Sequence, residues 1–218
     1  MTNNITYIAV EGVIGAGKTT LASALAERLN ARLVLENFSD NPFLGKFYQD
    51  QRRYAFRTQL FFLLERYMQL VELNQKDLFH KYIVSDYIFE KDKIFAYLNL
   101  SDEELKIYES IVEGLEKNIL NPDLVIYLQC STEKLMDNIT RRNREIERGI
   151  SFEYIDNLND AYNYFFSRYK GSRILIVNSE QADFISNQAD IENLIGEIFN
   201  PEIPAVKYFN PSIRKVAE

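Results

Sequence analysis

A glycine-rich turn directly after an apolar run constrains this chain more than any other feature. The run Ile5–Glu11 has the composition of a buried strand, and residues 12–20 follow it with the sequence GVIGAGKTT, which matches the pattern G-x-x-x-x-G-K-[ST]. Glycine lets such a turn curl until successive backbone N–H groups face a phosphate, and the next helix adds the positive end of its dipole. The turn therefore predicts a site for a nucleoside triphosphate.

Each part of this loop has an expected role toward the nucleotide. The Lys18 ammonium is expected to reach the β- and γ-phosphates, and the Thr19 hydroxyl to ligate Mg²⁺. A GTPase would need the guanine-binding sequence N-K-x-D, which the chain lacks. The predicted nucleotide-binding residues are Gly12, Val13, Ile14, Gly15, Ala16, Gly17, Lys18, Thr19 and Thr20.

Apolar segments alternate with helical patterns along the rest of the chain. We predict strands over Ile5–Glu11, Leu33–Glu36, Tyr82–Ser85, Leu124–Gln129 and Ile174–Val177. We predict helices over Lys18–Asn30, Tyr54–Leu78, Glu103–Lys117, Thr132–Glu147, Ser151–Tyr169 and Asn187–Phe199. This alternation predicts an α/β fold of three layers (α/β/α) around a central five-stranded parallel sheet. We expect one domain over residues 1–200 and a C-terminal tail over residues 201–218, whose prolines exclude one continuous helix.

Charge and composition exclude several classes of protein. Lysine and arginine number 25, aspartate and glutamate number 32, and the net charge of −7 argues against a nucleic-acid-binding surface. The single cysteine, Cys130, cannot form an internal disulfide, which is typical of a reducing compartment. No apolar run approaches the ~18 residues needed to span a bilayer, and no signal-peptide pattern is present. We expect a cytoplasmic protein that binds neither nucleic acid nor membrane.

A carboxylate at the end of the second predicted strand is a candidate catalytic base. The strand ends at Glu36, and carboxyl ends of parallel strands point into the ligand crevice of such sheets. A carboxylate there can take the proton of an acceptor hydroxyl, although a solvated strand-end carboxylate is the alternative. Aromatic residues follow, and a ring among Phe61, Phe62 and Phe89 could stack on a planar ligand, although most rings of the chain are expected in the core.

At this point the chain resembles the deoxynucleoside kinases, the family of deoxycytidine, deoxyguanosine and deoxyadenosine kinases. In that family a tyrosine follows the carboxylate after strand two, a glutamine comes eleven residues later in a phenylalanine-rich helix, and an arginine seven after that. Tyr48, Gln59 and Arg66 stand at these spacings. The resemblance implies that Gln59 binds the nucleobase edge, that Tyr48 holds the sugar 3′-hydroxyl, and that Arg66 helps to define base specificity.

The segment after the third predicted strand departs from the family pattern. The family carries an acidic residue, arginine and serine ahead of Ile-Phe-Ala, whereas this chain has Ser85-Asp86-Tyr87 at the aligned place before residues 94–96. The arginine that steadies the catalytic carboxylate and the acceptor oxygen in the family is therefore missing. We expect Asp86 to serve Mg²⁺ through water or to hold the acceptor site, with a plain strand-end carboxylate as the alternative.

A cluster of arginines late in the chain predicts a phosphate-binding lid. Four arginines fall within residues 141–148, and guanidinium groups suit the charge spread over a transferring phosphoryl group. A solvated charged helix is the alternative. In the resembling family this segment is the arginine-rich lid, which places Arg142 and Arg144 on the phosphates and Glu147 on the sugar 3′-hydroxyl. Residues 177–184 similarly resemble the loop that receives the donor adenine, with an ordinary loop as the alternative.

The resemblance implies a P-loop kinase that transfers the γ-phosphoryl group of ATP to the 5′-hydroxyl of a 2′-deoxynucleoside. Glu36, Lys18, Arg142, Arg144 and Asp86 are then the expected catalytic residues, and the family's habit implies a homodimer. A monophosphate kinase of the thymidylate type is one alternative, with Arg52, Arg53 or Arg57 holding the acceptor phosphate. A non-catalytic nucleotide-binding regulatory protein is another. Preference for a purine or a pyrimidine stays open, and His80 and Cys130 are expected to be structural.

Overall fold

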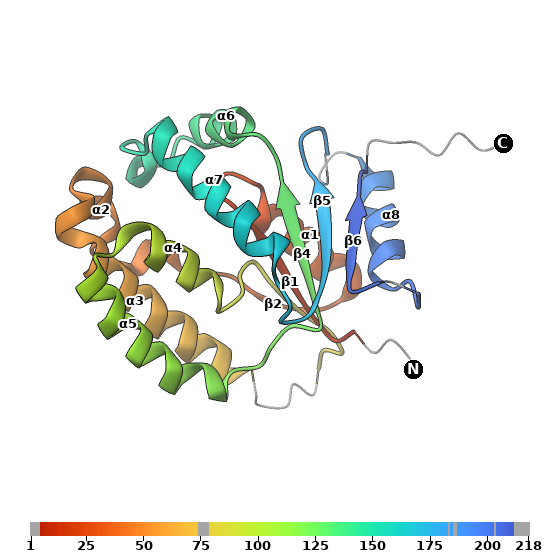
Figure 1. The fold of residues 1–218 in the computed structure, drawn as a ribbon. Coiled ribbons are helices and arrows are strands. Elements are labelled where there is room, and N and C mark those ends of the chain that lie inside the picture. The colour runs from red at the N-terminus through yellow and green to blue at the C-terminus, as the bar shows by residue number, and fades with distance from the viewer. Residues whose placement is uncertain (1–4, 74–78, 183, 185–186, 203, 212–218) are drawn as a thin grey trace.

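A parallel sheet of six strands forms the centre of the molecule (Figure 1). The computed structural model describes residues 5–73, 79–182, 184, 187–202 and 204–211. The strands are β1 (Tyr7–Gly12), β2 (Arg32–Val34), β3 (Ile83–Ser85), β4 (Leu124–Gln129), β5 (Arg173–Asn178) and β6 (Val206–Phe209). Their order is β2-β3-β1-β4-β5-β6, and every neighbouring pair runs parallel. The predicted α/β class is confirmed.

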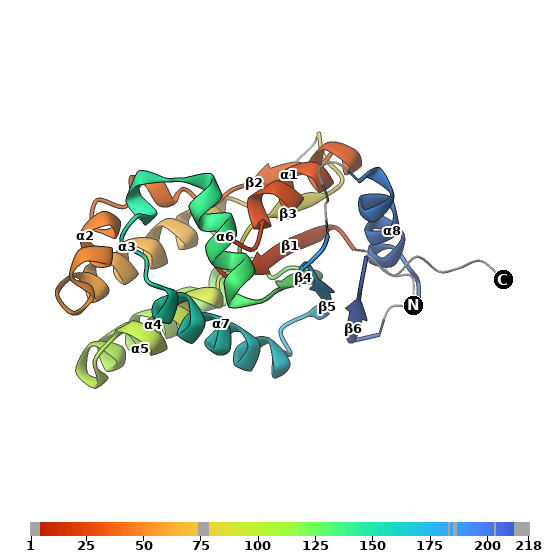
Figure 2. The same cartoon turned by 90° about the horizontal axis from the view of Figure 1, so that it is seen from above.

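Helices cover both faces of this sheet. Figure 2 shows α1 on one face and α7 on the opposite face. The described helices are α1 (Lys18–Leu29), α2 (Leu44–Gln49), α3 (Gln51–Glu72), α4 (Lys91–Asn99), α5 (Asp102–Leu115), α6 (Thr132–Arg142), α7 (Phe152–Ser167) and α8 (Gln188–Ile198). Short 3₁₀ turns lie at Phe38–Asp40, Glu116–Asn118 and Glu145–Glu147. None of the described helices is long and apolar enough to cross a membrane.

The core lies where the central strands meet the helices. All six residues of β1 are buried, as are five of the six in β4, because apolar residues on both faces of a central parallel strand are covered by helices. On the α7 face the ring of Tyr127 stacks on that of Phe166, with 4.4 Å between the centroids. This rigid centre places the carboxyl ends of β1, β2 and β3 beside one another, which is where the site forms.

The predicted five-stranded sheet is wrong by one strand. β6 comes from the segment expected to be a tail, and it pairs in register with β5 from Ile174 opposite Val206 to Val177 opposite Phe209. The strand is short and two of its four side chains are exposed, so its apolar pattern is weak in the sequence. The segment Val206–Phe209 therefore extends the sheet.

Two helix boundaries also differ from the prediction. The helix expected over residues 132–147 ends at Arg142, because Asn143 takes a left-handed conformation with φ 49° that caps it, and a separate 3₁₀ turn follows. The helix expected from Tyr54 begins at Gln51, where the Asp50 carboxylate accepts a hydrogen bond from the Arg53 N–H, 3.2 Å away. Its predicted end over residues 74–78 lies outside the described residues. Helix α4, which was not predicted, begins at Lys91.

Candidate active site

The phosphate-binding loop connects β1 to α1 and needs glycine at two of its positions. Gly15 and Gly17 have φ angles of 90° and 93°, in the left-handed region that favours glycine. A Cβ atom on Gly15 would lie 2.6 Å from the carbonyl oxygen of Leu135 in α6, closer than packed atoms approach. These constraints hold the loop in the curled shape in which backbone N–H groups can face an anion, as its sequence predicts.

Lys18 is held inside this loop by the loop's own backbone. Its Nζ donates to the carbonyl oxygens of Gly12, at 2.8 Å, and Val13, at 3.1 Å. Burial, together with the neighbouring ammonium of Lys91, lowers the pKa of Lys18 to about 8. The phosphates of a bound nucleotide would supply the opposite charge that this ammonium needs.

A buried carboxylate that the prediction missed joins the loop to the segment after β3. Glu11 is fully buried in β1, and its two oxygens accept hydrogen bonds from the N–H groups of Gly12, at 3.0 Å, and Ile88, at 2.9 Å. Burial raises the pKa of this carboxyl. A glutamate inside an apolar strand was the signal in the sequence, because a buried carboxylate needs partners of this kind.

Asp86 connects three parts of the site. Its Oδ2 accepts from the Thr19 hydroxyl at 2.6 Å, and its Oδ1 accepts from the Glu36 backbone N–H at 2.7 Å. The side chain follows β3 directly, and the residue is 4% exposed. Asp86 therefore fixes the end of β2 against the first turn of α1, where phosphates would lie.

The Glu36 carboxylate lies between two cations. Arg66 Nη2 is 2.6 Å from Oε1, and Lys91 Nζ is 2.8 Å from Oε2. Burial alone would raise the pKa of Glu36, but the charges of Arg66 and Lys91 outweigh burial and lower the pKa to about 2. Glu36 is therefore ionised throughout the neutral range and can accept a hydrogen bond from a hydroxyl.

Arg66 links this carboxylate to a second, fully buried one. Its Nη1 forms an ion pair with Asp92, whose other oxygen accepts from the Tyr108 hydroxyl at 2.8 Å. The guanidinium also lies over the Phe62 ring, with its Cζ 4.9 Å from the centroid. Gln59 joins the same cluster, because its Nε2 donates to the Asp92 carbonyl oxygen at 2.7 Å. The cluster fixes one wall of a cavity beside Glu36.

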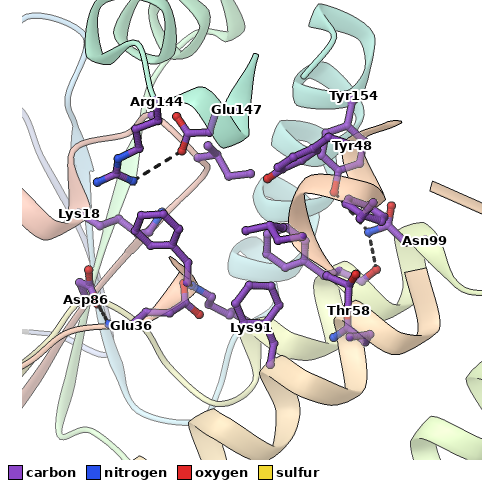
Figure 3. Close-up of a pocket in the computed structure, with 18 of the residues that line it drawn as sticks. Lys18, Glu36, Tyr48, Thr58, Asp86, Lys91, Asn99, Arg144, Glu147 and Tyr154 are labelled. Atoms are coloured by element: carbon purple, nitrogen blue, oxygen red, sulfur yellow. Dashed lines mark hydrogen bonds and ion pairs between the residues drawn. The ribbon is translucent and has the colours of Figure 1, made fainter. Parts of the chain in front are cut away.

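This cavity is bounded by charged groups on one side and by aromatic and amide groups on the other. Figure 3 shows Lys18, Asp86 and Glu36 across the cavity from Tyr48 and Asn99. Of the three rings considered for stacking, Phe62 lines the cavity, whereas Phe89 is buried in the core and Phe61 is outside the lining. The aromatic lining residues are Phe38, Phe47, Tyr48, Phe62, Phe95, Tyr154 and Tyr162.

The arginine-rich segment closes the top of this cavity. Arg142 contacts Glu147 with two nitrogens, its Nη2 lying 2.6 Å from Oε1 and its Nε 3.1 Å from Oε2. Arg144 lies 3.6 Å from the same carboxylate and stacks over the Phe38 ring (Figure 3). Both guanidinium groups are about one-third exposed, and Glu147 is buried. The lid residues therefore face the cavity and hold one another in place.

The lid also contacts both halves of the site. Asn138 of α6 donates to the Gly15 carbonyl oxygen at 2.9 Å, next to the phosphates' expected position. At the other end, a Cβ atom on Gly149 would lie 3.3 Å from the Tyr48 carbonyl oxygen, so the lid packs closely on α2. Movement of the lid would therefore change its contacts with the phosphate loop and with α2 together.

A separate groove runs from the phosphate loop along α6 to the loop after β5. This groove lies where the donor adenine was expected, and the predicted loop contributes residues 179, 181, 182 and 184, while Asp183 lies outside the described residues. The lining residues are Gly15, Ala16, Gly17, Thr20, Lys134, Asn138, Arg141, Arg142, Ser179, Gln181, Ala182 and Phe184. Its basic side chains suit a polyphosphate.

The structure places all the predicted catalytic, substrate-binding and metal-binding residues around the acceptor cavity. They are Lys18, Thr19, Glu36, Tyr48, Gln59, Arg66, Asp86, Arg142, Arg144 and Glu147. Lys91 and Asn99 also line it and were missed. The sequence held one indication for Lys91, because Ser85-Asp86-Tyr87 contains no cation where the resembling family has an arginine.

The residues predicted for Mg²⁺ have suitable chemistry. The Thr19 hydroxyl and the Asp86 carboxylate are hard oxygen ligands 2.6 Å apart, and they stand beside the lysine expected to bind phosphate. Mg²⁺ in kinases is held by one or two protein oxygens plus phosphates and water. Among the described residues no group of three or more histidine, cysteine, aspartate or glutamate side chains could hold a metal alone. The pair fits a metal that arrives with the nucleotide.

Comparison with protein families identifies this arrangement. Residues 8–203 match the family model described as deoxynucleoside kinase. The deoxyguanosine kinase of Bacillus subtilis is 32% identical over 203 residues, covering 90% of this chain and 97% of the relative. The deoxyadenosine kinase of Dictyostelium discoideum is 34% identical over 213 residues, covering 94% and 82%.

Solved structures give the same result for the fold. A structure of deoxyadenosine kinase from M. mycoides with bound dCTP is 27% identical, has a TM-score of 0.75, and covers 88% of this chain and 98% of that one. A second structure of deoxyadenosine kinase from M. mycoides, with bound dATP, has a TM-score of 0.77 at 24% identity, with coverage of 89% and 100%. The likeness extends over nearly the whole described chain.

Proposed function

The chain belongs to the deoxynucleoside kinase family, and from this premise we propose that its acceptor cavity takes a purine 2′-deoxynucleoside. As a member it is an ATP-dependent phosphotransferase that produces a deoxynucleoside 5′-monophosphate. The observation that supports this use of the cavity is the position of Glu36, ionised and 2.6–2.8 Å from two cations, between the phosphate loop and the aromatic wall.

Glu36 takes the acceptor proton in this proposal. As the 5′-oxygen bonds to the γ-phosphorus of ATP, the bond from that phosphorus to the bridging oxygen breaks and its electron pair leaves with ADP. The hydroxyl proton passes to the Glu36 carboxylate and then to water. A carboxylate with a pKa of about 2 is a weak base, but phosphoryl transfer depends mainly on positioning and on charge stabilisation.

Groups on three sides stabilise the negative charge on the phosphoryl group during its transfer. Lys18 and the loop amides lie on one side, and Arg142 and Arg144 approach from the lid. Thr19 and Asp86 would hold Mg²⁺, which supplies charge neutralisation on the β- and γ-phosphates when bound. In this proposal the arginines exchange their contacts with Glu147 for contacts with phosphate as the lid closes and excludes water.

Sugar and base are held by the opposite wall. Tyr48 and Glu147 both face the cavity, where they are proposed to bind the 3′-hydroxyl, and Phe62 is positioned to stack on the base. Because the Asp92 carbonyl oxygen already binds Gln59 Nε2, Gln59 Oε1 is the atom left to accept from a base amino group. Adenine, guanine and cytosine all carry such an amino group, so the purine preference is supported by the names of two relatives, a deoxyguanosine kinase and a deoxyadenosine kinase.

Family membership decides against the two alternatives considered from the sequence. A non-catalytic regulatory protein does not agree with the match to this enzyme family along residues 8–203. A thymidylate-type kinase would need an arginine for the acceptor phosphate, and the three candidates, Arg52, Arg53 and Arg57, are exposed and outside the cavity lining. The acceptor is therefore proposed to be a nucleoside.

An exposed apolar groove between α4 and α7 supports the expected homodimer. Tyr97 and Tyr164 are 61% and 64% exposed, and Ile94 and Phe165 line the groove between them. A second copy would bury these rings. Light scattering should then give twice the 25.6 kDa chain mass, and Tyr164→Glu should reduce it to one chain mass. A cytoplasmic location, inferred from the single cysteine, stays a prediction.

The test of this function is ADP release from Mg·ATP with each of the four deoxynucleosides and, separately, with dTMP. We expect the highest kcat/KM with deoxyadenosine or deoxyguanosine and the lowest with thymidine, whose base has no amino group. Turnover on dTMP alone would contradict the nucleoside assignment. Highest kcat/KM with thymidine would contradict the purine preference while leaving the family assignment intact.

A further inference from the structure

A buried lysine follows the triplet in which this chain lacks the family's arginine. Lys91 is the first residue of α4, its side chain is 3% exposed, and its Nζ lies 2.8 Å from Glu36 Oε2. The three residues aligned with the family triplet do not supply a cation, and Tyr87 directs its hydroxyl to Gln69 Oε1, 2.7 Å away. A positive charge is therefore supplied by the first turn of α4, through Lys91, and not by the residues directly after β3 (Figure 3).

The other cations near this point are already engaged elsewhere. Arg66 holds Asp92 as well as Glu36, and Lys18 is bonded to the carbonyl oxygens of its own loop. Lys93, two residues further along α4, forms an ion pair with Glu116 at 2.7 Å and lines the outer groove. Among these, Lys91 has the ammonium group best placed to leave its carboxylate contact and meet a reacting oxygen.

The position of Lys91 is costly for a residue with a merely structural role. Burial of an ammonium group is unfavourable, and the first turn of a helix carries the positive end of the dipole, which also disfavours a cation. Lys18 is a second positive charge nearby, and the two ammonium groups repel each other, because Lys91 contributes to lowering the pKa of Lys18. Unfavourable electrostatics concentrated in a cavity are typical of functional sites.

We propose that Lys91 is a catalytic residue, which orients Glu36 before transfer and donates hydrogen bonds to the 5′-oxygen and the γ-phosphoryl group during it. The inference rests on the proposed role of Glu36. A hydroxyl bonded to the Glu36 carboxylate comes within reach of an ammonium 2.8 Å from the same group. Lys91 keeps its proton throughout, while the hydroxyl proton goes to Glu36, so charge is stabilised without a further transfer.

The primary test compares Lys91→Met and Lys91→Arg with the wild-type enzyme, using Lys106→Met as the control because Lys106 is exposed on α5. We expect Lys91→Met to lower kcat by roughly 10²–10³-fold, with KM for the deoxynucleoside changed by less than about threefold. Lys91→Arg should recover part of this loss.

A Lys91→Met enzyme with kcat within about threefold of wild type would overturn the proposal. Should Lys91→Met fail to fold, Lys91→Ala with added methylammonium replaces it. Rescue of kcat by at least about tenfold, with no effect of methylammonium on wild type, is the expected result, and no rescue counts against the proposal. Wild-type turnover measured alongside separates this failure from failure of the kinase assignment, in which wild type would be inactive on all deoxynucleosides.

Discussion

The donor half and the acceptor half of this site are built in different ways. The donor half is a run of nine consecutive residues, 12–20, in which Lys18 is held by carbonyl oxygens of its own loop. The acceptor half assembles side chains from three separate segments, with Glu36, Arg66, Lys91 and Asp92 joined in one network of ion pairs. A substitution in the donor loop should therefore act locally, whereas a substitution in the acceptor network should disturb several interacting residues together.

The largest expected effect tests the local character of the donor loop. Lys18→Ala removes the ammonium directed at the phosphates and should lower kcat by roughly 10³–10⁵-fold, the range for charged groups on a transferring phosphoryl. Deoxynucleoside affinity, measured by calorimetry, should change little, with Lys106→Ala as the control. A large loss of nucleoside affinity in Lys18→Ala would show that the two halves are coupled.

The next effect tests the interlocked acceptor half. Glu36→Gln keeps the shape but removes the proton acceptor, so kcat should fall by roughly 10²–10⁴-fold. Since Arg66 and Lys91 lose their shared carboxylate, the thermal stability should change as well. The control Glu113→Gln, at an exposed position of α5, should leave kcat and thermal stability unaltered. Unchanged kcat would remove Glu36 as the base.

A smaller effect concerns pH and the donor loop. In the free enzyme Lys18 has a pKa of about 8, so it is mostly charged below pH 8 and mostly neutral above it. ATP favours the charged form, and its affinity should therefore fall as pH rises through 8, by up to about tenfold per pH unit. Calorimetry at pH 8 in buffers of different ionisation enthalpy should show proton uptake on binding, and Lys18→Met should abolish it. Proton release would contradict the assignment.

The smallest effect concerns a polar atom in the acceptor wall. The Thr58 hydroxyl is buried and has no hydrogen-bond partner among the residues that the structure describes, whereas the equally buried Thr132 hydroxyl donates to Asp156 at 2.8 Å. Thr58→Val should therefore raise the free energy of unfolding by about 1 kcal/mol, and Thr132→Val should lower it by a similar amount. Urea denaturation measures both. Equal destabilisation by the two substitutions would show that Thr58 has a partner in solution.

Sequence reasoning succeeded where structure depends on neighbouring residues. The phosphate loop and the positions of five strands along the chain followed from glycine positions and apolar runs, because these features act over a few residues. Lys91 was missed because its contact with Glu36 joins residues 55 positions apart, and the start of α4 leaves no strong signal. The break at Asn143 was missed because arginines and glutamates suit a continuing helix, and only the cap conformation ends it.

The extra strand at the end of the chain has a consequence for how the molecule behaves among its own copies. The six-residue apolar strand β5 would otherwise present its open backbone to any extended chain that met it. With β6 in place, the strand facing solvent is four residues long, with Lys207 paired to Glu197 beside it, and β2 at the other border has three residues. Short, charged borders discourage intermolecular strand addition, so β6 protects the molecule against aggregation.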